Sequence, residues 1–279
     1  MKNRIAALCL ALALFASGVH AAEWRPAFFA FDNGVGRGSW TPAQQAQTLK
    51  ELGYAGIGYS GTDDLAARLK AFEEQRLKVF SIYVACFADR EEAFAPELAA
   101  AIKALKGTDV VIWLTVQGKA GNDPRAAEAV RQVADLAAAS DLKVVLYPHH
   151  GFVVATLEDA LRIRNRVDRN NLGVSFNLCH ELRAGNEPRF EALLEEAMPY
   201  LDLISINGAD QEGGWDKLIQ PLDRGEFDVY GLLKTLKALG YGGPIGLQCY
   251  QVPGDIRENL ARSMAQWQVF QKRLRAETE

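Results

Sequence analysis

The sequence predicts an α/β protein, a (β/α)8 TIM barrel built as a single domain. Short runs rich in β-branched and aromatic residues alternate with amphipathic helical segments, which is typical of parallel strands joined by crossover helices. Eight such strand and helix pairs can be counted along the chain. The chain has 279 residues, and the part that follows its first apolar run is close to the roughly 250 residues of a typical TIM barrel.

Each predicted strand is a short apolar run bounded by turn residues. The eight strands are predicted at 27–32, 56–60, 79–87, 110–116, 144–148, 172–177, 203–207 and 245–250. A doubly wound open sheet is the alternative fold. The count of eight strands favours the barrel over it. The segment 31–38 contains glycines without a helix directly after them, so we expect a loop over the barrel mouth there rather than a phosphate cradle.

The helices between the strands have ordinary start and stop signals. Thr41 and Asp123 each precede a proline, which places an N-cap side chain before a proline at the first helical position. Gly53 and Gly240 supply the left-handed residue that ends the first and seventh helices. A last amphipathic helix at 256–275 is expected to close the ring. No linker or low-complexity tract interrupts the chain, so one domain at 22–279 is predicted.

The first 21 residues have the pattern of a secretory signal peptide. Lys2 and Arg4 precede an apolar run at 5–19, and small residues suited to cleavage follow around Ala21. A membrane anchor is the alternative, but a span needs roughly 20 apolar residues. We therefore expect that the signal peptide at 1–21 is cleaved and that the domain beginning at residue 22 is a periplasmic or secreted protein without a membrane anchor.

Charge bears on the possible partners of the protein, and the cysteines bear on whether it contains disulfides. Without Lys2 and Arg4, 29 of the 31 basic residues remain against 35 acidic ones, so nucleic acid is not expected as a partner. Cys86, Cys179 and Cys249 are predicted to be buried free thiols rather than a disulfide framework. The sequence gives no indication of the oligomeric state.

Polar side chains gather where four predicted strands end. In a barrel of parallel strands, residues at the carboxyl ends face one common mouth. Tyr147 and Pro148 end the fifth strand and His149 follows it. Asn177 ends the sixth, with His180 and Glu181 close behind. Ser205 and Asn207 lie in the last three residues of the seventh, and Gln248 lies in the last three residues of the eighth. These positions are the predicted functional site.

The spacing of these residues resembles that of the xylose-isomerase-like TIM barrels, a superfamily of sugar-phosphate isomerases and epimerases. Asn177-Leu-Cys-His180 resembles the Asp-x-x-His of that family, in which the Asp binds a divalent metal and the His contacts the sugar. Leu146-Tyr-Pro-His149 is similar to its Leu-Glu-x-His, and the loop at 220–228 is similar to its Pro-Gly-x-Gly-x-x-Asp. The segments 52–57 and 236–244 also resemble the family, so the likeness covers most of the chain after the predicted signal peptide.

The resemblance implies that four metal-ligand positions are substituted. Tyr147, Asn177, Ser205 and Gln248 stand where the family has two glutamates, an aspartate and a histidine. Neutral amides and hydroxyls do not offset the cost of dehydrating a divalent cation as carboxylates do. We therefore expect no metal and no other cofactor. With Asn207, the same side chains are predicted to bind sugar hydroxyls. The aromatic side chains at 83, 113, 215 and 250 could offer flat faces for a sugar ring, but for any one of them filling of the core is the expected role.

Three hypotheses about function follow. The first is a sugar-active enzyme of the isomerase, epimerase or lyase type, acting on a small sugar or glycoside with His149, His180 or Glu181 as catalytic acid or base. Weaker candidates for a second acid or base lie at 32, 119 and 210. The second is a non-catalytic carbohydrate-binding protein. The third is a metalloenzyme with a rearranged site of His149, His180 and Asp210.

Overall fold

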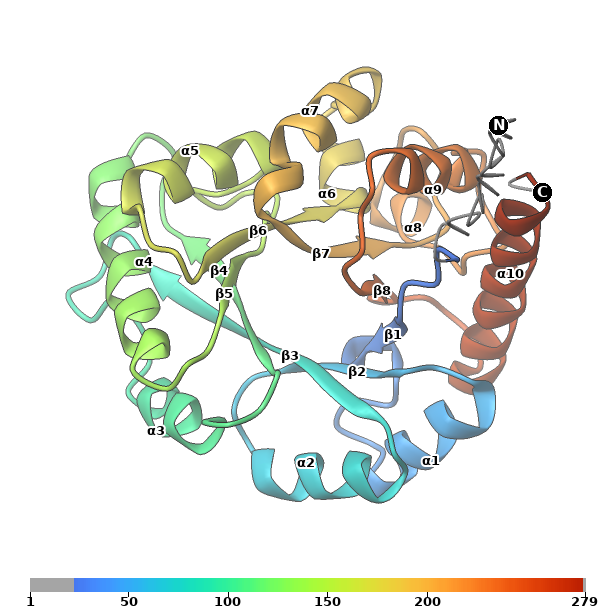
Figure 1. Cartoon of the computed structure of the whole chain (residues 1–279), viewed down its shortest axis with the longest axis horizontal. Helices are drawn as coiled ribbons and strands as arrows, with labels where there is room; N and C mark the ends of the chain where they lie inside the picture. The colour runs from blue at the N-terminus through green and yellow to red at the C-terminus, as the bar shows by residue number, and fades with distance from the viewer. Residues whose placement is uncertain (1–22, 278–279) are drawn as a thin grey trace, which may run out of the picture.

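A computed structural model describes residues 23–277, and its eight strands form a closed barrel in which every neighbouring pair is parallel (Figure 1). The strands are β1 (Phe28–Phe31), β2 (Gly56–Ser60), β3 (Lys78–Phe87), β4 (Val111–Gln117), β5 (Val144–Leu146), β6 (Leu172–Asn177), β7 (Leu201–Ile206) and β8 (Ile245–Leu247). Because β8 pairs with β1, the sheet has no edge. The predicted TIM barrel is confirmed, and the open sheet is wrong. The predicted signal peptide at 1–21 lies outside the described residues.

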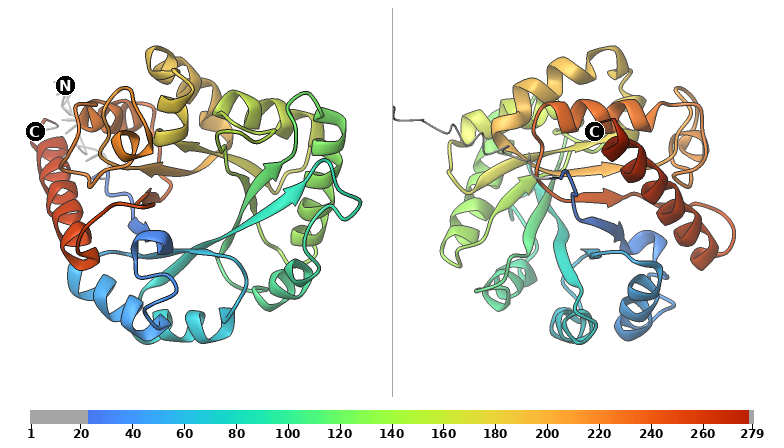
Figure 2. Two further views of the ribbon diagram at one scale, coloured as in Figure 1. Left: turned by 180° about the vertical axis from the view of Figure 1, so that it is seen from behind. Right: turned by 45° about the vertical axis from the view of Figure 1, so that its right-hand side comes forward.

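The helices lie outside the ring of strands, as the views from both sides show (Figures 1 and 2). They are α1 (Pro42–Leu52), α2 (Leu65–Glu74), α3 (Glu97–Ala104), α4 (Asp123–Ala138), α5 (Leu157–Val167), α6 (Leu178–Arg183), α7 (Phe190–Ala197), α8 (Trp215–Leu218), α9 (Val229–Ala238) and α10 (Ile256–Ala276). Helix α10 packs against α1 and closes the ring as predicted. None of the helices described is both long and apolar enough to cross a membrane.

Two helix starts show how far local sequence signals hold. Thr41 caps α1 through a capping box with Gln44, and Gly53 ends the helix in the left-handed conformation with φ 87°. Helix α4 differs, because it begins at Asp123 itself and no side chain caps it. The Asp123 carboxylate instead forms an ion pair of 2.8 Å with Arg162 of α5. The prediction that Asp123 is the N-cap of α4 is wrong, because its carboxylate pairs with the guanidinium of Arg162 and not with the backbone of α4.

The barrel interior is filled by aromatic side chains that form a cluster of their own, separate from the core between strands and helices. Phe31 stacks on Trp113 with ring centroids 4.7 Å apart. Trp113 is fully buried and donates its indole N–H to Ser175 Oγ at 2.8 Å. This tryptophan therefore fills the barrel, as expected for most single aromatic side chains at strand ends, and does not offer its face to a ligand. The aromatic layer forms the floor on which the site is built.

The three cysteines of the described chain, Cys86, Cys179 and Cys249, are free and buried, as predicted. Burial raises the pKa of each thiol, and that of Cys179 reaches about 12. A thiol with so high a pKa is a poor nucleophile at neutral pH. We therefore assign none of them to chemistry.

Candidate active site

A pocket with a volume of 470 Å³ opens at the carboxyl ends of the strands. This volume lies within the roughly 300–1,000 Å³ typical of small-molecule sites. Its wall is formed by Phe31, Asn33, Arg37, Ser60, Tyr83, Tyr147, His149, His150, His180, Trp215, Ile219, Gln248, Tyr250 and Gln251. The pocket therefore lies at the end of the barrel where the sequence predicted a site.

Two histidines meet in this pocket from different elements. His149 follows β5, and His180 lies in α6, which begins directly after β6. Their ring centroids are 4.4 Å apart. His149 also stacks on Phe152 with centroids 4.3 Å apart. The two rings are thus held side by side by packing and by the short connections that follow two neighbouring strands.

The backbone of His150 gives the two rings opposite tautomers. Its N–H lies 3.2 Å from Nδ1 of His180, so this nitrogen must accept, and the proton of the neutral ring is on Nε2. Its carbonyl oxygen lies 2.9 Å from Nδ1 of His149, so this nitrogen must donate, and Nε2 of the neutral ring is left as an acceptor. One ring therefore offers a donor at Nε2 and the other an acceptor.

Both rings are neutral at physiological pH. Burial lowers the pKa of His149 below its ordinary value, the hydrogen bond to the carbonyl of His150 partly offsets this effect, and repulsion from the His150 ring adds to the lowering. Burial lowers the pKa of His180 still more, with added repulsion from His149 and His150. Because both pKa values fall below about 6.5, the two tautomers persist near pH 7.

The four substituted positions of the resemblance come together through hydrogen bonds. Ser205 Oγ donates to Asn177 Oδ1 at 2.9 Å, and Asn177 Nδ2 donates to the carbonyl of Pro148 at 2.8 Å. Gln248 Nε2 donates to the hydroxyl of Tyr147 at 3.2 Å. Tyr147 and Gln248 line the pocket, whereas Asn177 and Ser205 are fully buried and do not. The four positions therefore lie at the same end of the barrel, but two of the four side chains support the wall from outside the pocket.

These side chains do not fit a divalent metal ion. Burial raises the pKa of Tyr147 well above its ordinary value, so none of the four is charged at neutral pH. Gln248 Oε1 already accepts hydrogen bonds from Asn33 Nδ2 and from the backbone N–H groups of Cys249 and Tyr250. Hard cations favour anionic oxygen ligands, which this set does not supply.

No alternative metal centre is assembled elsewhere in residues 23–277. There, no group of three or more His, Cys, Asp or Glu side chains lies in a position to hold a metal ion. Asp210, which the rearranged metal site requires beside His149 and His180, forms an ion pair of 3.7 Å with Lys217 instead. The structure therefore does not bring the rearranged set together.

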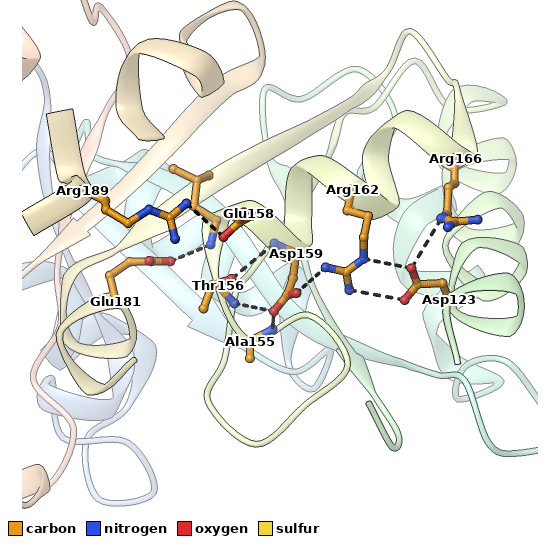
Figure 3. Close-up of polar contacts among 10 residues, drawn as sticks. Asp123, Ala155, Thr156, Glu158, Asp159, Arg162, Arg166, Glu181 and Arg189 are labelled. Atoms are coloured by element: carbon orange, nitrogen blue, oxygen red, sulfur yellow. Dashed lines mark hydrogen bonds and ion pairs between the residues drawn. The ribbon is translucent and has the colours of Figure 1, made fainter. Parts of the chain in front are cut away.

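Glu181 lies outside the pocket, although it was predicted to be catalytic. Its carboxylate accepts the backbone N–H of Leu157, the first residue of α5, at 2.6 Å and Nδ2 of Asn186 at 2.8 Å. Figure 3 shows the side chain pointing toward the start of α5, beside Thr156. A carboxylate at a helix N-terminus is stabilised by the unpaired N–H groups there. The helical turn of α6 carries residue 181 away from the face that residue 180 presents to the pocket.

Asn207 is also placed away from the pocket wall. Its amide N–H₂ group donates to the carbonyls of Gly208 and Leu218, at 2.8 and 2.7 Å, and so holds the connection from β7 to α8. Of the weaker candidates, Lys119 is exposed away from the pocket. Asp32 is buried behind the wall and accepts from the backbone N–H and the hydroxyl of Ser60 at 3.1 and 2.7 Å. Its role is to hold Ser60 at the pocket.

Sequence reasoning missed several residues of the wall, which are Asn33, Arg37, Ser60, His150 and Gln251. Ser60 is the last residue of β2, so the rule that selected the other strand ends also applies to it. The loop after β1 contributes Asn33 and Arg37, and it lies over the mouth as predicted. Nothing in their local sequence distinguishes these two side chains from ordinary loop residues.

Aromatic side chains surround the mouth. Among the described residues, the large hydrophobic side chains that stay exposed are Trp215, Tyr250 and Val269, and the first two line the pocket. Trp215 meets the ring of His180 edge to face, with centroids 5.4 Å apart. Tyr83 meets Tyr147 in the same way at 4.9 Å. Exposed aromatic faces beside polar groups suit a ligand that has both apolar and hydroxylated surfaces.

Comparisons with known proteins agree with this architecture. Residues 46–268 match the model of the family described as xylose isomerase-like TIM barrel. An uncharacterized protein of Methanocaldococcus jannaschii is 29% identical over 98 residues, which are 35% of this chain and 32% of that protein. The chain therefore matches only about a third of the length of that relative.

Several solved structures share the whole barrel. The 3-keto-D-glucoside 4-epimerase YcjR from E. coli superposes with a TM-score of 0.71 at 15% identity, over 90% of this chain and 100% of that one. An L-ribulose 3-epimerase gives 0.72 at 15% identity, over 90% and 96%. The probable 3-DHS dehydratase AsbF from Bacillus anthracis gives 0.68 at 14% identity, over 86% and 98%. At such low identity these likenesses show the fold alone.

Proposed function

The chain belongs to the xylose isomerase-like TIM barrel family, and we propose that it is an isomerase-like or epimerase-like enzyme that acts on a sugar. The observation that carries this proposal is the pair of neutral histidines with opposite tautomers in the pocket. Such a pair offers one proton acceptor and one proton donor at the same place. Two of the structural neighbours are named as sugar epimerases, which is consistent with this chemistry.

The proposed reaction moves a proton at a carbon next to a carbonyl group. His149 Nε2 takes the proton from that carbon, while His180 Nε2 donates its proton to the carbonyl oxygen, so the C–H electron pair becomes the double bond of an enediol. Return of both protons to new positions gives the isomerised sugar and restores both rings. General acid and base catalysis of this kind contributes about 10²–10⁴-fold.

The wall of the pocket supports a sugar or a glycoside as the substrate. Trp215 and Tyr250 offer exposed aromatic faces, on which the C–H face of a sugar ring can pack. Asn33, Ser60 and Gln251 add polar groups that suit hydroxyls. No Asp or Glu is part of the wall, so the sugar hydroxyls would meet amide, hydroxyl, imidazole and guanidinium groups there.

We propose that the reaction proceeds without a divalent metal or other cofactor. The neutral, mutually hydrogen-bonded set of Tyr147, Asn177, Ser205 and Gln248 supports this proposal. We also propose export to the periplasm or the medium after cleavage of the signal peptide at 1–21, which is supported by the order of its charged, apolar and small residues.

Solvent exchange tests the proposed function. The protein is incubated in D₂O with ketohexoses and with 3-keto-glucosides, with and without EDTA, and NMR follows the loss of C–H signals beside the carbonyl. We expect exchange that EDTA does not abolish. Exchange that depends on an added divalent metal would contradict metal-free chemistry. If none of the tested sugars exchanged, the proposal that the protein is an enzyme of this type would be wrong.

A carbohydrate-binding protein is the second candidate. The observation in its favour is the exposed pair of aromatic side chains, Trp215 and Tyr250, which suits binding whether or not chemistry follows. Binding of the same sugars by calorimetry, without any exchange in D₂O, would support this function over catalysis.

A further inference from the structure

A second cavity with a volume of 180 Å³ lies beside the central pocket, between the loop after β1, the end of β8 and the start of α10. Asn33, Gln248 and Gln251 line both cavities. A hydrogen bond of 2.7 Å from Asn33 Nδ2 to Gln248 Oε1 is part of the partition between them. The two cavities therefore share a wall of polar side chains rather than of packed core.

Three amides of the second cavity keep an unused acceptor. Asn259 Nδ2 donates to the carbonyl of Pro253 at 2.9 Å, and Gln220 Nε2 donates to the carbonyl of Lys217 at 2.8 Å. No donor among the described residues bonds to the amide oxygens of these two partly exposed side chains, so both oxygens are free to accept from a ligand.

The amide oxygen of Asn33 also lacks a donor, and it is buried. Its amide nitrogen donates to Gln248 Oε1, and its own oxygen, Oδ1, is buried without any hydrogen-bond partner. A buried acceptor without a donor destabilises the folded protein. A ligand hydroxyl at the partition would remove this cost.

The other side of the second cavity is apolar. Leu247, Val252, Ile256 and Leu260 line it, and no charged side chain does. A ligand that fits this cavity therefore has one apolar face, hydroxyl donors and no charge. A sugar ring has this combination, because its C–H groups form one face and its hydroxyls point outward from its edge.

We propose that the second cavity is a subsite for a second sugar ring, so that the natural substrate is a disaccharide or a similar glycoside. The reacting ring occupies the central pocket beside the histidine pair, and the linked ring reaches past Asn33 into the second cavity. This inference rests on the proposed function for the placement of the reacting ring. The second ring itself takes no part in the proton transfer.

The test compares binding of single and double rings. Titration calorimetry measures the dissociation constants of methyl α-D-glucoside, methyl β-D-glucoside, maltose and cellobiose. We expect at least one disaccharide to bind about tenfold tighter than its methyl glucoside, since the second ring adds contacts to a preformed cavity. Val252→Trp fills the second cavity, and we expect it to reduce this preference to below about twofold.

Two further variants complete the test. Val269→Trp places the same side chain on α10 at a position that is 48% exposed and far from the subsite, so it should leave the preference unchanged. Asn259→Leu removes one acceptor with little change in volume, and we expect it to weaken disaccharide binding severalfold. It keeps the test decisive if the tryptophan variant is unstable.

The outcomes separate this inference from the proposed function. If no disaccharide binds more than threefold tighter than its methyl glucoside, or if Val252→Trp and Asn259→Leu both leave the preference intact, the subsite is wrong. Disaccharide preference without any exchange in D₂O would support the subsite and refute the catalytic proposal. Exchange with keto-sugars without any preference for disaccharides would support the catalytic proposal and refute the subsite.

Discussion

At the scale of single residues, the histidine pair divides the chemistry between two rings. His149 is left with an acceptor at Nε2 and His180 with a donor, because each Nδ1 faces a different backbone group of His150. The side chain of His150 makes neither of these hydrogen bonds, although repulsion from it adds to the lowering of both pKa values. The identity of residue 150 therefore matters less than the path of its backbone.

Replacement of His149 by Gln should lower the rate of solvent exchange by about 10²–10⁴-fold with little change in sugar affinity, because the proton acceptor is lost and the polar contact is kept. The measurement is the initial rate of deuterium incorporation together with the dissociation constant. His150→Gln is the matched control, and its loss should be much smaller. Equal losses in the two variants would contradict the assigned roles.

The pH dependence of exchange provides a second prediction for the same residue. A base must be neutral, and burial lowers the pKa of His149 below its ordinary value of about 6.5. The rate should therefore stay constant as the pH falls through 6.5 and decrease only at lower pH, as His149 becomes protonated. A decrease centred at pH 6.5 or above would show that a different group acts as the base.

At the scale of elements, Glu181 connects α6 to the start of α5, and its burial has a cost that depends on pH. Burial raises the pKa of this carboxyl to about 7, against a value near 4.5 in the unfolded chain. Between these two pH values the folded protein binds more protons than the unfolded one, so ionisation of Glu181 makes the folded state less stable as the pH rises.

Replacement of Glu181 by Gln removes this penalty. The free energy of unfolding of the variant, relative to the native protein, should increase by about 2.5 kcal/mol between pH 5 and pH 8. Urea denaturation at both pH values measures it. The control is Glu158→Gln on the first turn of α5, where the carboxylate is 58% exposed and pairs with Arg189 (Figure 3). A similar change in both variants would contradict the effect of burial.

Strands and helices could be predicted from sequence because their signals are local. Hydrophobic periodicity located all eight strands, and Thr41 with the glycine at 53 marked both ends of α1. The residues at strand ends followed from the geometry of the barrel. Glu181 and Asn207 could not be placed, because the direction of a side chain after a strand depends on the turn that follows. The same limit applies to Asp123, whose partner Arg162 is 39 residues away.

At the scale of the whole molecule, the barrel depends on glycines that face its aromatic interior. A Cβ atom on Gly246 of β8 would lie 2.7 Å from the ring of Phe29, which is fully buried. Gly246→Ala should therefore lower the free energy of unfolding by about 1–3 kcal/mol, as overpacking does in other cores. Urea denaturation measures this loss.

The control for that prediction is Gly242, which lies three residues before β8 begins at Ile245. Gly242 is exposed, and a Cβ atom there would meet nothing within 4 Å. Gly242→Ala should change the stability by less than about 0.5 kcal/mol. If the two alanine variants were equally stable, the interior of the barrel would be less tightly packed than the structure indicates.

The fixed tautomers also have a stereochemical consequence. With a single acceptor nitrogen, a proton removed from one face of the enediol is returned to that same face. Transfer between adjacent carbons on one face interconverts an aldose and a ketose, whereas inversion of a carbon requires a second base on the opposite side of the sugar plane. In the proposed reaction, the pair formed by His149 and His180 would therefore favour isomerisation over epimerisation, and solvent deuterium should enter the product without inverting the carbon that carries it.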